Sequence, residues 1–94
     1  PRLRLWMILP YEAQAARYPH RDRLRYEALL ARADLVRYTA GHYYTGCFLT
    51  RDRVLAESAD GCICYLTRST GGTAYTVRHA ALRDIPIINL AELL

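Results

Sequence analysis

The sequence predicts an α/β fold, with a Rossmann-like parallel sheet of about four strands and helices on both of its faces. Four short and nearly continuous apolar segments alternate with segments whose apolar residues recur at helical spacing. Parallel strands covered on both sides have this continuous apolar character, and crossover helices lie between them. We expect a single domain over residues 1–94, since 94 residues are near the lower limit for burying a core unaided.

The first half of the chain predicts two strands and two helices. The first strand is expected at Leu3–Leu9, and a short helix at Tyr11–Arg17. A longer helix is expected from Pro19 to about Ala33, because proline suits the first turn of a helix. The second strand is expected at Asp34–Tyr38. The inner face of the longer helix is predicted to carry Leu24, Ala28 and Ala31.

The second half predicts helix, strand, glycine turn, helix and strand. The first helix begins at Gly46 and carries Phe48, Leu55 and Ala59 at helical spacing. The following elements are expected at Gly61–Leu66 (strand), Thr67–Gly72 (turn), Thr73–Leu82 (helix) and Ile85–Leu90 (strand). Right-handed crossovers would place the start of both helices on one rim of the sheet, at the carboxyl ends of the strands.

The segment from Gly61 to Leu82 has the order in which many α/β proteins hold a phosphate. A strand enters a turn that ends in Gly71-Gly72, and a helix begins there. Unpaired N–H groups and the helix dipole attract an anion at such a place, and glycine lets the backbone approach it closely. The sequence therefore predicts an anion site at this turn.

Arg51 lies near the middle of the apolar side of the preceding helix. A guanidinium that faces a sheet is costly unless an anion meets it. Two interpretations stay open: an anionic ligand, or an internal salt bridge to Asp34, Asp52 or Asp60.

Composition narrows the class of protein. The net charge is +4 and all 13 basic residues are arginine, which is compatible with nucleic-acid binding without establishing it. The longest apolar run is well short of the roughly 20 residues that span a bilayer, so no membrane partner is expected. Three cysteines, an odd number, fit a reducing compartment, and we expect a cytoplasmic protein.

No metal and no cofactor is expected. Cys62 and Cys64 point to the same face of their strand, but a zinc site would need two further ligands, and no His or Cys lies at a familiar spacing. Small core residues on a buried strand are the simpler interpretation of this pair. Hydroxyl nucleophilic catalysis through Ser69 or Thr70 with His79 is not favoured, because an orienting acid and the strained GxSxG turn are both missing.

The pattern YTxGCxxxRxR…ADxCICYL…GGTAYTVRxA…IPIINL resembles the SLOG superfamily of Rossmann-like domains over nearly the whole chain. It is most similar to the bacterial and phage YpsA/YoqJ-like branch, a group of unknown function. That branch begins with a further strand and a glycine-bearing segment, so the resemblance implies a domain that lacks its N-terminal part. It also implies a phosphate-bearing ligand at the glycine turn, as a nucleotide-derived small molecule or single-stranded nucleic acid.

Related phosphoribohydrolases of the superfamily cleave the N-glycosidic bond of nucleoside 5′-monophosphates. They carry an Arg-Lys pair on the helix and a glutamate after their glycine motif. Here Arg51 matches the arginine, but Asp52 follows it, and no carboxylate follows Gly71-Gly72-Thr73 before Arg78. Glycoside hydrolysis normally needs two catalytic groups, so we expect no catalytic residue and no chemistry of the chain's own.

The predicted function is binding of a nucleotide-derived ligand or nucleic acid. An N-glycoside hydrolase and a protein-interaction module that has lost the ligand are the alternatives, and a homodimer would be unsurprising by analogy. The candidate phosphate-binding residues are Arg51, Gly71, Gly72, Thr73 and Thr76. The candidates for contacts with a base or with neighbouring loops are Tyr43, Tyr44, Arg53 and Tyr75, and a weaker candidate is His42.

Overall fold

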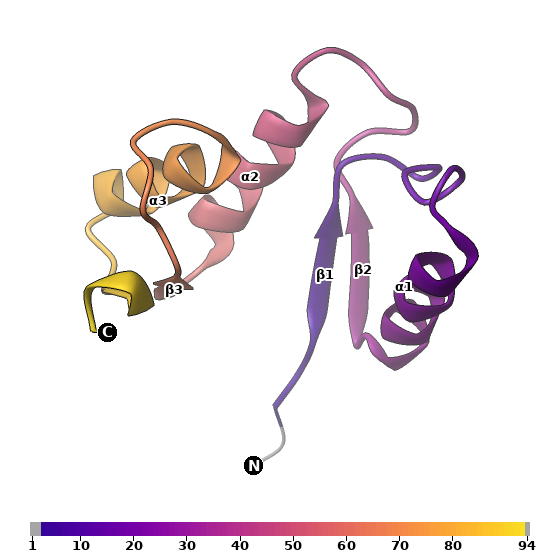
Figure 1. Cartoon of the computed structure of the whole chain (residues 1–94), viewed down its shortest axis with the longest axis horizontal. Coiled ribbons are helices and arrows are strands. Elements are labelled where there is room, and N and C mark those ends of the chain that lie inside the picture. Colours follow the sequence, from indigo (N-terminus) through magenta and orange to yellow (C-terminus); the bar gives the residue numbers. More distant parts are fainter. Residues whose placement is uncertain (1–2, 94) are drawn as a thin grey trace. The chain divides into compact units, whose positions relative to one another are not determined.

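The structure, a computed structural model, describes residues 3–93 and has a mixed α/β architecture. It divides into two compact units, Pro1–Cys47 and Phe48–Leu94, and each is described by itself (Figure 1). The predicted α/β class with parallel strands is confirmed. The strands form two two-stranded parallel sheets, and a single sheet of about four strands stays a prediction.

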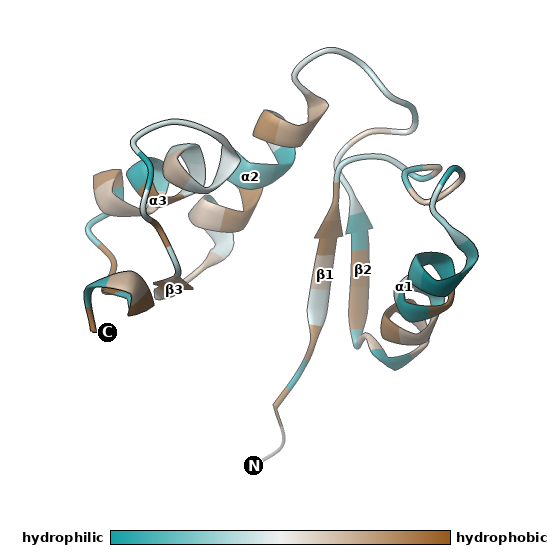
Figure 2. Ribbon diagram, viewed as in Figure 1, coloured by the Kyte–Doolittle hydropathy of each residue, from teal (hydrophilic) through white to brown (hydrophobic). Residues whose placement is uncertain are grey.

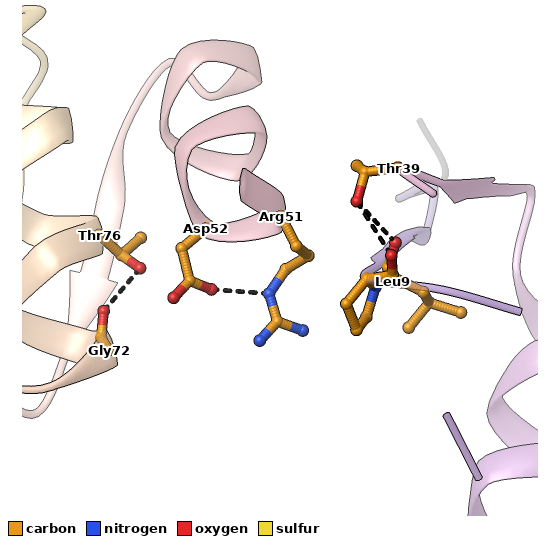
Figure 3. Close-up of polar contacts among 7 residues, drawn as sticks. Leu9, Thr39, Arg51, Asp52, Gly72 and Thr76 are labelled. Carbon is orange, nitrogen blue, oxygen red and sulfur yellow. Dashed lines mark hydrogen bonds and ion pairs between the residues drawn. The ribbon is translucent and has the colours of Figure 1, made fainter. Parts of the chain in front are cut away.

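The first unit is a β-α-β arrangement. Strand β1 (Trp6–Leu9) pairs in parallel with β2 (Leu35–Tyr38), and helix α1 (His20–Arg32) connects them. The register runs from Trp6 opposite Leu35 to Leu9 opposite Tyr38. At the end of the pair, the Thr39 hydroxyl donates to the Leu9 carbonyl at 3.2 Å, which fastens the two strand ends together (Figure 3).

Helix α1 was predicted at the right place but with the wrong inner face. Its less exposed side chains include Tyr26 and Leu30, and no residue of α1 is fully buried. The first half of α1 is strongly hydrophilic (Figure 2), which leaves little apolar surface for a packed stripe. The three residues predicted to face inward, Leu24, Ala28 and Ala31, are exposed.

No helix forms at Tyr11–Arg17, where one was predicted. Successive turns occupy this segment, closed by backbone bonds from Gln14 N to Tyr11 O (3.4 Å) and from Ala16 N to Ala13 O (3.0 Å). These bonds span three residues. Seven residues make too few α-helical bonds to offset the cost of nucleating a helix.

The second unit continues the alternation. Helix α2 (Cys47–Ser58), whose first residue belongs to the first unit, precedes strand β3 (Cys62–Cys64), helix α3 (Gly72–Leu82), strand β4 (Ile87–Asn89) and the short 3-10 helix η1 (Leu90–Glu92). β3 and β4 are parallel, with Cys62 opposite Ile87 and Cys64 opposite Asn89. The strands are shorter than predicted. Pro86 has no N–H to donate, and the Asn89 side chain caps η1 directly after β4.

One face of the β3–β4 sheet is covered by the helices of the second unit. Ala56 of α2 and Ala74 and Ala80 of α3 are buried, and small residues allow a close approach of helix to sheet. The opposite face carries Ile63 and Ile88, which are paired in register and are 73% and 50% exposed. This unit therefore has a helix-covered face and an apolar face that its own residues leave open. Within residues 3–93, no helix is long and apolar enough to cross a membrane.

Candidate anion site at the start of helix α3

The glycine turn begins α3 without a side-chain cap. Gly71 is the N-cap residue, with φ 100° and ψ 178°, and no side chain of the described chain bonds to the cap. The first intrahelical bond runs from Tyr75 N to Gly71 O at 3.0 Å. The N–H groups of Gly72, Thr73 and Ala74 precede that bond and have no acceptor within the helix. Because the first turn contains no acidic residue, its partial positive charge is not offset by a side chain of α3.

A cavity of about 280 Å³ opens at this turn. Its walls come from the end of β3, the turn and the first residues of α3: Tyr65, Leu66, Thr67, Arg68, Thr70, Gly71, Gly72 and Thr73. The turn itself is braced by Arg78, whose Nη1 donates to the Ser69 carbonyl at 3.0 Å. Three of the predicted residues, Gly71, Gly72 and Thr73, therefore lie together in one cavity wall.

Arg68 is the residue of this cavity that sequence analysis missed. Its side chain is exposed, and within residues 3–93 it forms neither an ion pair nor a side-chain hydrogen bond. A guanidinium without an internal partner can offer a planar set of donors to an oxyanion. The one available signal was its position, two residues after an apolar strand segment and ahead of the Gly71-Gly72 pair.

Arg51 forms the internal salt bridge that was one of its two interpretations. Its Nε donates to Asp52 Oδ1 at 2.6 Å (Figure 3). Its guanidinium carbon lies 5.8 Å from the centroid of the Phe48 ring. Asp52 is 7% exposed and is the buried acidic residue of α2. The bond to Asp52 uses only Nε, so the four Nη hydrogens of Arg51 can donate to a ligand.

Asp52 also lies beside the glycine turn. A β-carbon built on Gly72 would stand 3.4 Å from Asp52 Oδ2, so this carboxylate oxygen is next to the first residue of α3. A negative charge there interacts favourably with the start of the helix. It also opposes the approach of a second anion, and the charge of Arg51 offsets that effect.

The other predicted residues of the second unit lie outside this cavity wall. Thr76 donates its hydroxyl to the Gly72 carbonyl at 2.9 Å, so it braces the first turn of α3 (Figure 3). Arg53 is exposed and pairs with Glu57 at 3.8 Å across one turn of α2. The Tyr75 ring contacts His79, with centroids 4.5 Å apart. His79 is half-buried.

Tyr43 and Tyr44 belong to the first unit. Tyr43 meets Tyr11 edge to face, with ring centroids 5.7 Å apart and the planes at 75°. Packing against a neighbouring loop, one of the two interpretations of Tyr43, is therefore observed. Tyr11 and Tyr43 line a cavity of about 430 Å³ together with Ala13, Gln14, Ala16 and Arg17. Tyr44 is exposed, and its carbonyl accepts from Cys47 N at 3.0 Å at the start of α2.

Within the described part of the chain, no three residues of the types His, Cys, Asp and Glu come together as a metal site would require.

The comparisons with known proteins add no assignment. The SLOG resemblance thus rests on the sequence pattern alone. No protein-family model matches the chain, and no curated protein does so either.

Proposed function

We propose that the chain binds a phosphate-bearing ligand at the start of α3, as a nucleotide-derived small molecule or single-stranded nucleic acid. One observation carries the proposal: the N–H groups at the start of α3, which no side chain caps, and Arg68, which has no side-chain partner among residues 3–93, border the same cavity. Backbone donors at a helix start and a guanidinium fork are both well suited to phosphate oxygens.

The composition of the cavity wall supports binding rather than catalysis. Its eight residues include one arginine, one tyrosine, two glycines and three threonines, but neither a carboxylate nor a histidine. Hydrolysis of an N-glycosidic bond would ask for groups that handle the leaving base and the developing cation. The Asp52 carboxylate lies beside the turn, and its Oδ1 is engaged by Arg51.

The proposal includes a SLOG-type Rossmann-like domain in which β1–β2 and β3–β4 are the halves of one four-stranded parallel sheet. Both pairs are parallel, and parallel strands rarely occur in isolated pairs. Solution X-ray scattering tests this directly. A single compact domain of this length has a radius of gyration of about 12 Å. A clearly larger value would contradict the joined sheet and would leave the anion cavity, which belongs to the second unit alone, unaffected.

The ligand is tested by thermal unfolding with pyrophosphate, AMP, ADP-ribose, a cyclic nucleotide and an oligothymidylate. A ligand present at 100 times its dissociation constant stabilises a fold by about 2.7 kcal/mol. For a domain of this size, each kcal/mol raises the midpoint by about 4–8 °C. We expect a shift with at least one phosphate compound, which Arg68→Gln reduces strongly.

Arg25→Gln is the matched control. Arg25 is an exposed arginine of α1, so its substitution removes the same charge outside the anion cavity. An equal loss in both variants would indicate a general charge effect and would contradict a site at Arg68. Absence of any shift in the folded wild-type protein would favour the interaction module over ligand binding.

A further inference from the structure

Strand β3 presents two cysteines on one face. Cys62 and Cys64 are two positions apart, and side chains at that spacing point to the same side of a strand. Both are half-buried free thiols, so both remain within reach of a small solute. The third cysteine, Cys47, is a fully buried free thiol at the start of α2.

The surroundings of Cys62 are apolar. It borders a cavity of about 220 Å³ whose other walls are Leu55, Ala56, Ala59, Gly61, Ile63, Thr76, Ala80 and Ile85. None of these side chains is titratable. The one polar group is the Thr76 hydroxyl, which donates to the Gly72 carbonyl.

The neighbouring strand β4 offers no further side chain that could bind a metal ion. Across the sheet, Cys62 is opposite Ile87 and Cys64 is opposite Asn89. The Asn89 amide makes three hydrogen bonds: Oδ1 accepts from Leu66 N at 3.0 Å and from Ala91 N at 3.1 Å, and Nδ2 donates to Leu66 O at 2.9 Å. The ligands that the covered face of this sheet provides are therefore two sulfur atoms.

Binding of a metal ion to a cysteine releases the thiol proton, because the thiolate is the ligand.

We propose that Cys62 and Cys64 form a two-coordinate site for a soft monovalent cation, with Cu(I) as the representative ion. Thiolates select soft ions, and Cu(I) is satisfied by two of them, whereas zinc sites of the structural type need four ligands. One Cu(I) ion forms two Cu–S bonds and displaces the two thiol protons to solvent. No electron is transferred, and the pair changes from neutral to a single negative charge.

The test is competition for Cu(I) supplied as its bicinchoninate complex under anaerobic conditions. We expect the wild-type protein to withdraw one equivalent of Cu(I). Cys62→Ala and Cys64→Ala should each weaken Cu(I) binding by more than about tenfold. Loss of an outer-shell partner of a metal ligand already costs about tenfold, and each of these variants removes a ligand itself. Cys47→Ala, which removes the third thiol, should bind as the wild type does. Equal binding by all four proteins would overturn the proposal.

A second measurement needs no substitution. One equivalent of Ag(I), an air-stable soft cation, is added to the wild-type protein before alkylation with iodoacetamide, and the modified cysteines are identified by mass spectrometry. We expect Cys62 and Cys64 to be protected together. Unchanged alkylation of both residues would contradict the site even if the variants failed to fold.

Discussion

Asp52 and Gly72 meet where α2 approaches the start of α3, with Asp52 Oδ2 only 3.4 Å from the position of a β-carbon on Gly72. The carboxylate binds Arg51 through its other oxygen at 2.6 Å. A buried acidic group thus lies beside the positive end of one helix and is paired with a cation of its own helix. This arrangement links the stability of the second unit to the charge that a ligand would encounter.

Substitution of Asp52 by Asn should have opposite effects on stability and on anion binding. The variant keeps the shape of the side chain but removes a charged hydrogen bond and a favourable charge at the helix start. We expect the free energy of unfolding to fall by about 1–2 kcal/mol. Affinity for pyrophosphate should rise several-fold at low salt because a repelling charge is gone. Urea titration and calorimetry measure the two quantities, and weaker pyrophosphate binding would contradict this electrostatic account.

Gly71 and Gly72 form a matched pair of substitutions. Gly71 has φ 100° and ψ 178°, a conformation close to glycine-only, so Gly71→Ala should cost about 1–3 kcal/mol. Gly72 is not in the left-handed region, and an added methyl group would be in ordinary contact with Asp52. Gly72→Ala should therefore change the free energy of unfolding by less than about 0.5 kcal/mol. Equal costs, measured by chemical denaturation, would show that crowding and not backbone conformation limits the turn.

Arg83 should matter more for stability than Arg53. Arg83 Nη1 donates to the carbonyls of Ala56 and Ala59, both at 2.8 Å, and so satisfies the C-terminal end of α2. Its replacement by Gln should cost about 1–2 kcal/mol. The exposed Arg53–Glu57 pair, at 3.8 Å, contributes little, so Arg53→Gln should stay within about 0.5 kcal/mol. The reverse order of the two unfolding free energies would contradict this assignment.

Tyr26 should make the protein sensitive to alkaline pH. Burial, and secondly the charge of Tyr38, raise the pKa of Tyr26 from 10.0 to about 12. The folded state therefore favours the protonated phenol. The resulting stabilisation is complete below pH 10 and is lost as the pH rises to about 12. We expect Tyr26→Phe to remove this part of the stability loss at alkaline pH. In a spectrophotometric titration at 295 nm, the variant should also lack the phenol absorbance change near pH 12. A Tyr26→Phe protein with the wild-type titration would contradict it.

The helices were largely predictable because their signals are local. Pro19 marked the start of α1 within one residue, and the Gly71-Gly72 pair marked the start of α3 within one residue. The strand ends were less predictable, since a strand extends only as far as its partner remains in register. Gly61–Leu66, for example, is apolar throughout, but only Cys62–Cys64 pairs with β4.

The candidate site was predictable in its backbone and less so in its charges. Glycine pairs after a strand are visible in the sequence, whereas Arg68 lies in an irregular turn where no periodicity assigns a direction to its side chain. The partner of Arg51 could not be chosen either. Neighbouring residues on a helix do not face each other, and it is the long Arg51 side chain that bends back to reach Asp52.

The side chain of Asn89 has a consequence for how the second unit opens. It holds the amide of Leu66, two residues beyond the end of β3, by a bond of 3.0 Å. That amide lies outside the ladder, but its protection from exchange with deuterated solvent depends on β4 remaining in place. Leu66 is thus a single-residue reporter for detachment of the last strand, and its exchange rate measures the local opening equilibrium.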